Sequence, residues 1–313
     1  MSITVLKPGL QTTIQSRPRA GLRHVGVPAS GAADPLSLAL ANKLVGNDWF
    51  VPALEATLLG PVLRFDVPCT FAFTGANATA TLNGDAVACH ETVAAKAGDI
   101  LDLGSATKGA RVYLAIPGGF PAEEVLGSTS TYLTGGLGGF NGRALEESDV
   151  LPVSQLPVSS LRTPDEFRMP MASSWALRAC ASFETDQLDA ADRQVLFDTN
   201  WVVGRRTDRM GLQIDGPRLH VSSEGRMPSA PVFPGTVQCP EHGSPFVLAV
   251  DAGTVGGYPR IAQIVRADRH LLGQLRPGDH VRLLKRETQS AIDELRAKLA
   301  YWRAWLDNID EVI

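Results

Sequence analysis

The sequence predicts a mainly β protein, and two observations support this prediction. Glycine and proline are frequent and spread along the chain, with 30 and 21 copies. Between them lie eight short apolar runs of strand length, many rich in β-branched or aromatic residues. Because these runs follow one another without regular helices between them, sandwiches or barrels are favoured over alternating βαβ units. The runs are Ser2–Leu6, Val62–Val67, Thr70–Thr74, Ile100–Leu103, Val112–Ile116, Phe246–Val250, Ile261–Val265 and His280–Leu284.

One helix is expected directly after Asp34. Asp34 is a good N-cap residue, and Pro35 is favourable at the first helical position. Leucines then recur every fourth residue from Leu36 to Leu44, which places them on one face. Gly46 supplies a stop signal, so the pattern predicts a helix over 35–44.

Three further helices are predicted. Pro121–Leu126 is a short candidate that ends at Gly127, and a second runs from Asp268 to Leu275 before a proline. The clearest helix lies at the C-terminus, where one apolar stripe recurs at helical spacing. The stripe consists of Ile292, Leu295, Leu299, Trp302 and Leu306. It either docks on its own domain or meets a partner chain, and the sequence leaves both readings open.

The length of 313 residues predicts two domains. The stretch 153–170 is rich in proline and serine and has no clear period, which indicates a boundary. We therefore expect an N-terminal β domain over 1–160, a C-terminal β domain over 161–287 and a terminal helix over 288–313.

Composition excludes several functional classes. The net charge is −4 and the basic residues are scattered, so nothing indicates nucleic acid as a partner. No run of 18 apolar residues predicts a membrane span, and the N-terminus lacks the pattern of a signal peptide. The four cysteines are far apart and are expected to be reduced thiols. Together these features predict a cytoplasmic protein.

No established catalytic motif is present. The six histidines form no HxH or HExxH pair, so no metal site is predicted, and there is no GxSxG nucleophile elbow. GxGxxG and GxxxxGK[ST] nucleotide loops are also missing from the sequence. His24 is a possible polar site residue. Ser128 and Thr129 are hydroxyls beside a glycine-rich stretch, although turn capping also explains such residues.

Three segments are candidates for holding an anion. Segment 135–143, GGLGGFNGR, has five glycines and ends in Arg143; successive glycines let main-chain N–H groups converge, and arginine grips carboxylates or phosphates. A hairpin connection is the alternative. Segment 204–211 carries three arginines and forms either a charged groove or a solvated loop. Segment 254–259, TVGGYP, follows a β run and offers two hydroxyls and two glycines, or simply a turn.

These segments together resemble a known family, the allophanate hydrolase subunit 2 group, which is also called the biotin-dependent carboxyltransferase domain family. The resemblance runs in order from about residue 3 to 285. Matching stretches include GVPASGAADPLSLALANKLVGND (26–48), VLGSTSTYLTGGLGGFNGRAL (125–145), DRMGLQIDGPRL (208–219) and AGTVGGYPRIAQIVRAD (252–268). The sequence departs from the family pattern at Pro35, in a longer segment 226–235, and in the helix beyond residue 287.

The resemblance implies two cyclophilin-like β-barrel domains and an enzyme component that works with other chains. The first implied function is the C subunit of an ATP-dependent 5-oxoprolinase, with a KipI-like B subunit, a LamB/YcsF-like A subunit, and ATP with magnesium at the level of the complex. The second is a carboxyltransferase or allophanate hydrolase component of urea degradation, which would use carboxybiotin. The third is a regulatory binding protein of the KipA type.

The substrate of a 5-oxoprolinase is a five-membered cyclic amide, a lactam, and the chemistry needed to open this ring suggests which residues form the site. One positioned acid or base contributes only about 10²–10⁴ in rate, so phosphorylating the lactam oxygen and holding the resulting anion would add the missing activation. We expect the catalytic residues to be Asp34, Tyr258 and Thr254. The expected substrate- or anion-binding residues are His24, Ser128, Thr129, Gly138, Gly139, Arg143, Arg206, Arg209, Gly256 and Gly257. The isolated chain is expected to have little activity.

Overall fold

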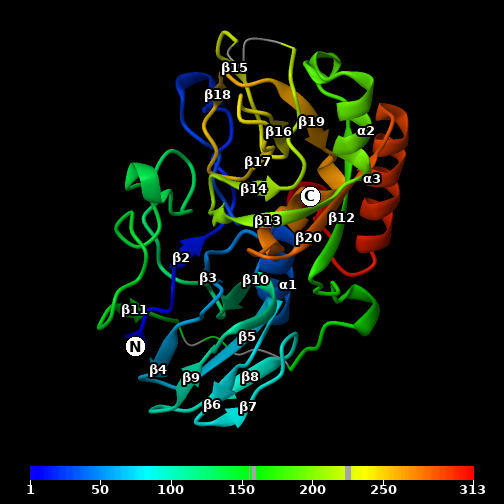
Figure 1. Ribbon diagram of the computed structural model, residues 1–313. Helices are drawn as coiled ribbons and strands as arrows, with labels where there is room; N and C mark the ends of the chain where they lie inside the picture. The colour runs from blue at the N-terminus through cyan, green and yellow to red at the C-terminus, as the bar shows by residue number, and fades with distance from the viewer. Residues whose placement is uncertain (155, 157–159, 223–226) are drawn as a thin grey trace. The chain divides into compact units, whose positions relative to one another are not determined.

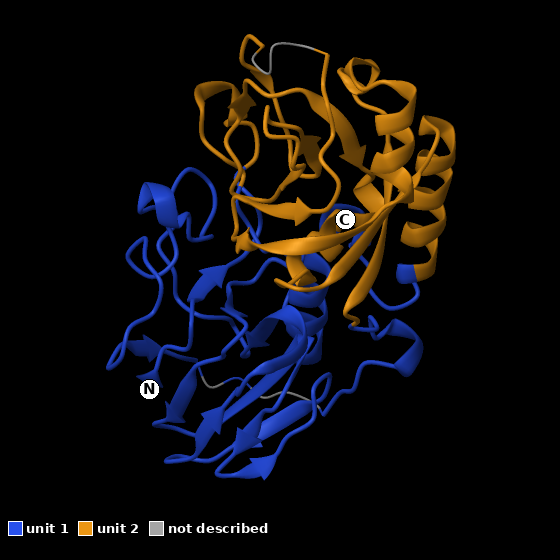
Figure 2. Ribbon diagram, viewed as in Figure 1, with its two compact units in different colours: residues 1–19, 30–171, 302–312 blue, residues 20–29, 172–301, 313 orange. Residues whose placement is uncertain are grey.

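A computed structural model describes residues 1–154, 156, 160–222 and 227–313. The gaps take residues 155 and 157–159 out of the expected boundary 153–170, and residue 226 out of segment 226–235, so the predictions at these positions lie outside the described residues. The chain divides into two compact units (Figure 2). Unit 1 holds residues 1–19, 30–171 and 302–312, and unit 2 holds 20–29, 172–301 and 313. Unlike the continuous ranges expected from the sequence, both units are discontinuous.

Unit 1 contains two mainly antiparallel sheets (Figure 1). The first has six strands in the order β11 (Val150–Pro152), β1 (Ser2–Lys7), β4 (Val62–Phe65), β9 (Ile100–Asp102), β6 (Thr81–Leu82) and β7 (Asp85–Ala86). The second has five strands in the order β2 (Thr12–Gln15), β3 (Ala53–Thr57), β10 (Ala106–Ala115), β5 (Cys69–Ala78) and β8 (Thr92–Ala95).

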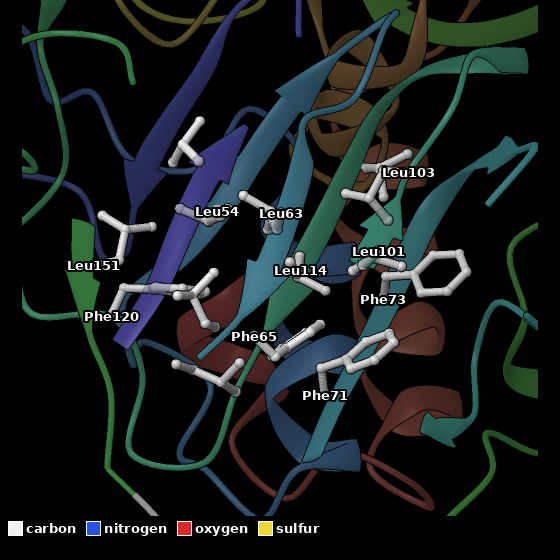
Figure 3. Close-up of a cluster of buried hydrophobic side chains, with 14 of the residues drawn as sticks. Leu54, Leu63, Phe65, Phe71, Phe73, Leu101, Leu103, Leu114, Phe120 and Leu151 are labelled. Atoms are coloured by element: carbon white, nitrogen blue, oxygen red, sulfur yellow. The ribbon is translucent and has the colours of Figure 1, made fainter. Parts of the chain in front are cut away.

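The main core of unit 1 lies between these sheets, as Figure 3 shows. Leu63 and Phe65 come from the first sheet, and Phe71, Phe73 and Leu114 come from the second; all five are fully buried. The rings of Phe65 and Phe71 stack with their centroids 5.3 Å apart. Burying such side chains is the main favourable term in folding, at roughly 1.5–3 kcal/mol each.

Helix α1 (Pro35–Leu44) has the bounds that the sequence predicts. Asp34 is its N-cap, and its carboxylate accepts a hydrogen bond from the Ser37 amide at 3.1 Å. The helix contacts β5 and β10 of unit 1. Its buried residues Leu38, Ala41 and Leu44 join Tyr113 in a second apolar cluster.

Unit 2 is built on a closed barrel of seven strands. Their order is β12 (Ser174–Cys180), β19 (Arg260–Ile264), β16 (Thr236–Gln238), β17 (Phe246–Leu248), β14 (Gly211–Asp215), β13 (Asn200–Thr207) and β20 (His280–Lys285). The pair β12–β20 closes the barrel in parallel, and the other pairs are antiparallel. A short pair outside the barrel joins β15 (Ala230–Pro231) to β18 (Val255–Gly256).

The mainly β prediction is confirmed, and each of the eight predicted runs overlaps a strand. A closed barrel is present in unit 2, whereas the strands of unit 1 lie in two sheets. In the part of the chain that the structure describes, no helix is long and apolar enough to span a membrane.

Of the other three predicted helices, one is absent and two differ in type or length from the prediction. The predicted helix over Pro121–Leu126 is wrong: the segment is irregular because its backbone pairs with residues 128 and 139. The predicted helix from Asp268 is a 3-10 helix, η5 (Arg266–Gln274). The C-terminal stripe spans α3 (Thr288–Trp302) and a turn, and then α4 (Ile309–Val312) follows. Helix α2 (Ala190–Asp198), which contacts β20, was not predicted.

Candidate functional site

A small cavity lies in unit 2, where the arginine-rich segment and the second glycine-rich segment of the sequence meet. Its volume is about 270 Å³. Four neighbouring barrel strands, β13, β14, β17 and β16, and the loops after β16 and β18 supply its walls. The lining residues are Arg206, Gln213, Gln238, Pro240, His242, Ser244, Phe246, Leu248 and Tyr258. An arginine, a tyrosine, two amides and a histidine therefore surround one hollow, with Phe246 and Leu248 of β17 as apolar lining.

Glycines shape this cavity by allowing close packing. A Cβ on Gly256 would lie 2.5 Å from the Gln238 side-chain nitrogen, and a Cβ on Gly211 would lie 2.3 Å from the Phe246 ring. Both distances are shorter than any real Cβ contact, so larger residues would displace the walls. The Gln238 Nε2 donates to the Tyr258 carbonyl at 3.2 Å, which ties the loop after β18 to the barrel.

The two candidate arginines of segment 204–211 have different surroundings. Arg209 is buried and donates from its guanidinium to both oxygens of Asp251, at 2.7 and 3.1 Å. This pair anchors the loop before β14 to the chain after β17. The Arg206 side chain lines the cavity and makes no ion pair or hydrogen bond with the described residues. Because its five N–H donors stay available, Arg206 can bind a carboxylate by two hydrogen bonds.

Tyr258 is the second candidate that the structure places at the cavity. It is 44% exposed, so its hydroxyl group is accessible to a small molecule. His242 and Ser244 come from the loop between β16 and β17, where the Ser244 amide donates to the His242 Nδ1 at 3.2 Å. The sequence analysis missed both residues, together with Gln213 and Gln238, because nothing in the local sequence marks them.

The other candidates in unit 2 do not line this cavity. Gly257 accepts at its carbonyl from the Met227 amide, and the Thr254 carbonyl accepts from the Val232 amide. His24 lies exposed in a 3-10 turn, η1 (Arg23–Val25). Its neighbour Arg23 donates to the Val232 carbonyl at 2.6 Å, so this turn is tied to the loops of the same unit.

In unit 1, Asp34 is fully buried and holds the start of α1. Besides the Ser37 amide, its carboxylate accepts from the Ser37 hydroxyl at 2.5 Å. The Asp34 amide donates to the Tyr113 hydroxyl at 2.7 Å, and that hydroxyl donates to Glu55 at 2.7 Å. Burial, and next the charge of Glu55, hold the pKa of Tyr113 well above its usual value. This network fixes the loop that enters the helix and points to a structural role for Asp34.

More than half of the main-chain donors of the glycine-rich segment 135–143 of unit 1 are used by nearby carbonyls. Five of its nine main-chain amides, those of residues 136, 137, 139, 142 and 143, donate to carbonyls within residues 129–140. Arg143 donates to both oxygens of Asp149, at 2.8 and 2.7 Å. The Arg143 side-chain hydrogen bonds lower the pKa of Asp149. A bound anion would have to displace these partners, so the geometry favours a folded connection.

The neighbouring candidates belong to the same connection. The Ser128 hydroxyl donates to the Arg17 carbonyl at 2.7 Å, and the Thr129 hydroxyl lies 2.6 Å from that of Ser16. Gly138 and Gly139 both have positive φ. A Cβ on Gly139 would lie 1.9 Å from the Thr131 hydroxyl, so glycine is required for packing there.

The described residues offer no group of three or more metal-ligating side chains. The four cysteines are free, as expected. Burial raises the pKa of Cys69 to about 11, of Cys89 to about 12 and of Cys239 to about 11. Because the thiolate is the reactive form, these three thiols are poor nucleophiles at neutral pH.

Comparison with known proteins defines the family. Residues 25–285 match the family described as "Carboxyltransferase domain, subdomain A and B". The chain belongs to this family. It is 34% identical to the C subunit of 5-oxoprolinase from Escherichia coli strain K12, over 97% of this chain and 98% of that one. It is also 31% identical to urea amidolyase of Saccharomyces cerevisiae, over 93% of this chain but only 17% of that one.

A solved structure of this carboxyltransferase-domain family has the same fold. The crystal structure of the K. lactis urea amidolyase superposes with a TM-score of 0.88 at 30% identity, covering 95% of this chain and 19% of that one. The family fold therefore occurs both in a protein of this length and as a fifth of a much longer chain.

Proposed function

We propose that this chain is the C subunit of an ATP-dependent 5-oxoprolinase, which hydrolyses 5-oxo-L-proline to L-glutamate together with partner subunits. One observation carries the proposal: the similarity to the C subunit of the Escherichia coli 5-oxoprolinase extends over nearly the full length of both chains. Urea amidolyases match with comparable identity, but this chain spans less than a fifth of their length.

The cavity of unit 2 suits a compact anionic substrate. Drug-sized ligands occupy pockets of about 300–1,000 Å³, whereas this cavity has about 270 Å³. It therefore fits a small carboxylic acid better than a whole nucleotide. Arg206 would bind the substrate carboxylate. Tyr258 and His242 would face the lactam ring, and Phe246 and Leu248 would exclude water from one side.

ATP, with magnesium, would supply the activation at the level of the complex. Phosphoryl transfer from ATP to the lactam oxygen would release ADP and convert a poor electrophile into a good one. Attack of one water would then break the C–N bond and open the ring to an acyl phosphate, and a second water would release inorganic phosphate and leave glutamate. We assign neither ATP nor magnesium to residues of this chain, because the amides of segment 135–143 are mostly occupied and the cavity is small. We expect a LamB/YcsF-like A subunit and a KipI-like B subunit to complete the site.

The test is an assay of glutamate release from 5-oxo-L-proline and ATP, with this chain and the two partner subunits purified separately. The expected result is ATP-dependent glutamate formation by the mixture and none by this chain alone. No glutamate from the folded, complete mixture would overturn the proposal.

A carboxyltransferase of urea degradation is the second candidate. The TM-score of 0.88 to a urea amidolyase structure favours it. In that reaction carboxybiotin would be the carboxyl donor, and Arg206 would hold the carboxylate that moves to the acceptor. Mixing the chain with a biotin carboxylase, a biotinylated carrier, bicarbonate, ATP and urea separates the two candidates, because only this candidate predicts urea-dependent consumption of carboxybiotin.

A further inference from the structure

A larger groove lies elsewhere in unit 2, beside helix α3. Its volume is about 630 Å³, and β12, β19, η5, α3 and the loops at 181–183 and 233 supply its walls. The walls are mainly apolar, yet several large side chains on them are open to solvent. Phe183 is 82% exposed, Phe233 is 50% exposed and Ile292 is 39% exposed.

Helix α3 leaves its apolar stripe only partly covered along this groove. Of the residues in this helix, Trp302 alone is buried, and it belongs to unit 1. Ile292 and Leu295, from the stripe that the sequence analysis singled out, line the groove instead. A helix that displays an apolar stripe of this kind normally packs against another element.

Two arginines add positive charge to the apolar walls. Arg266 donates to the main-chain oxygen of Ile313. The Arg269 side chain makes no hydrogen bond or ion pair with any residue that the structure describes, and burial, and next the charge of Arg266, lower its pKa. A guanidinium group partly removed from water is stabilised by an anion.

The carboxylates close to the groove do not pair with Arg269: the exposed Glu287, which acts on Cys180 of the groove wall, makes no ion pair with it, and the others are held by different arginines. Asp268 and Glu294 pair with Arg178 at 2.5 and 3.3 Å. Glu184 pairs with Arg260 at 2.7 Å. Neither Arg178 nor Arg260 lines the groove. The complementary negative charge is therefore expected from another molecule.

The exposed phenylalanine rings indicate which kind of molecule would bind in the groove. A small carboxylate next to Arg269 would leave Phe183 in water, whereas a protein segment would cover the rings and the α3 stripe together. Exposed apolar patches rimmed by charge are typical of protein interaction surfaces. The family fold also makes up only 19% and 17% of two urea amidolyase chains.

We propose that the groove formed by α3, Phe183, Phe233 and Arg269 binds a partner subunit through a segment that presents an apolar side chain next to a carboxylate. This inference rests on the proposed function for the existence of a partner. The apolar side chain would pack between Phe183 and Ile292, and the carboxylate would pair with Arg269.

The test measures the affinity of the purified chain for the purified KipI-like partner by isothermal titration calorimetry. Arg269→Glu and Phe183→Ser should each weaken binding at least tenfold. Two controls introduce the same new residues outside the groove: Arg218→Glu, at an exposed arginine, and Leu10→Ser, at an apolar side chain that is 64% exposed. Both controls should bind within twofold of the unchanged chain.

A second measurement does not depend on how a variant folds. Phe183 is mostly exposed, so benzoyl-phenylalanine can replace it, and irradiation should cross-link the chain to the KipI-like partner. Cross-linking at position 10 should fail. The cross-linked partner peptide should contain an aspartate, a glutamate or a terminal carboxylate.

Three outcomes overturn the proposal. The first is equal affinity of Arg269→Glu, Phe183→Ser and the unchanged chain. The second is binding of hexanoate that Arg269→Glu abolishes while the partner still binds, which would make the groove a small-ligand site. The third is no binding of the partner at all; glutamate release by the complete mixture would then still support the proposed function, so the two failures are distinguishable.

Discussion

Two regions of the molecule carry the same residue types, glycines beside arginines, and use them differently. In segment 135–143 of unit 1, the amides donate to nearby carbonyls and Arg143 is held by Asp149. At the cavity of unit 2, Gly256 and Gly211 let side chains approach closely, and Arg206 keeps its donors available. A glycine-rich segment with an arginine therefore indicates an unusual backbone conformation or close packing. Whether such a segment can bind an anion depends on whether the arginine already has a partner in the protein.

The largest effect is expected at Arg209, which the sequence placed in the same cluster as Arg206. Arg209→Met leaves Asp251 as an unpaired buried carboxylate, and breaking such a pair costs about 3–5 kcal/mol. Urea unfolding should show this loss of stability. The control Arg205→Met changes an exposed arginine on the preceding strand β13 and should stay within about 0.5 kcal/mol. Equal stability of the two variants would contradict the buried pairing.

A pH effect of similar size is expected from His90 in unit 1. Burial, and next the charge of Arg168, lower its pKa from 6.5 to about 4. Above pH 6.5 the ring is neutral in both states and its contribution to stability is complete. As the pH falls from 6.5 towards 4, the unfolded chain takes up the proton first, and up to about 3 kcal/mol of stability is lost.

The variant His90→Asn isolates this contribution. Asparagine tolerates the positive φ of 66° at this position and does not titrate in this range. The difference in unfolding free energy between the two proteins should therefore change between pH 6.5 and 4 and stay level above 6.5. A difference that is constant across this range would contradict the depressed pKa.

Two glycines test whether segment 135–143 is a packed structure. Gly142 and Gly127 both have positive φ, so an alanine costs about 1–2 kcal/mol of strain at either position. A Cβ on Gly142 would also lie 2.1 Å from the Gly136 carbonyl oxygen, whereas nothing lies within 4 Å at Gly127. Gly142→Ala should therefore lose about 2 kcal/mol more than Gly127→Ala in urea unfolding. Equal losses of unfolding free energy would indicate that segment 135–143 rearranges around the added Cβ at little cost.

Local signals explain which parts of the fold could be predicted. Helix α1 followed from Asp34, Pro35 and the leucine spacing, because capping and periodicity act within a few residues. Segment 121–126 was wrongly predicted as a helix because its backbone pairs with Gly139, a contact that local sequence does not encode. The C-terminal stripe was predicted as one helix, but α3 ends at Trp302 and Leu306 lies between α3 and α4, because the spacing of apolar residues does not show where a helix stops.

The candidate site was predictable only in part. Arg206 and Tyr258 were singled out by residue type, and the barrel brings them to one cavity although 52 positions separate them. The sequence did not indicate the other polar lining residues, because only the pairing of the barrel strands brings them to the cavity. They are Gln213, Gln238, His242 and Ser244. The Arg143–Asp149 pair lies only six residues apart, but charge type alone does not reveal whether an arginine pairs locally or faces a ligand.

The central claim is that the cavity of unit 2, rather than segment 135–143, contacts the substrate. The most direct test is kcat/KM for 5-oxo-L-proline in the complete mixture of subunits, measured for Arg206→Ala and Arg143→Ala. Arg206→Ala should reduce kcat/KM at least tenfold, about 1.4 kcal/mol, chiefly through KM. Arg143→Ala should change it less than twofold. A large loss for Arg143→Ala with an unchanged value for Arg206→Ala would contradict the account.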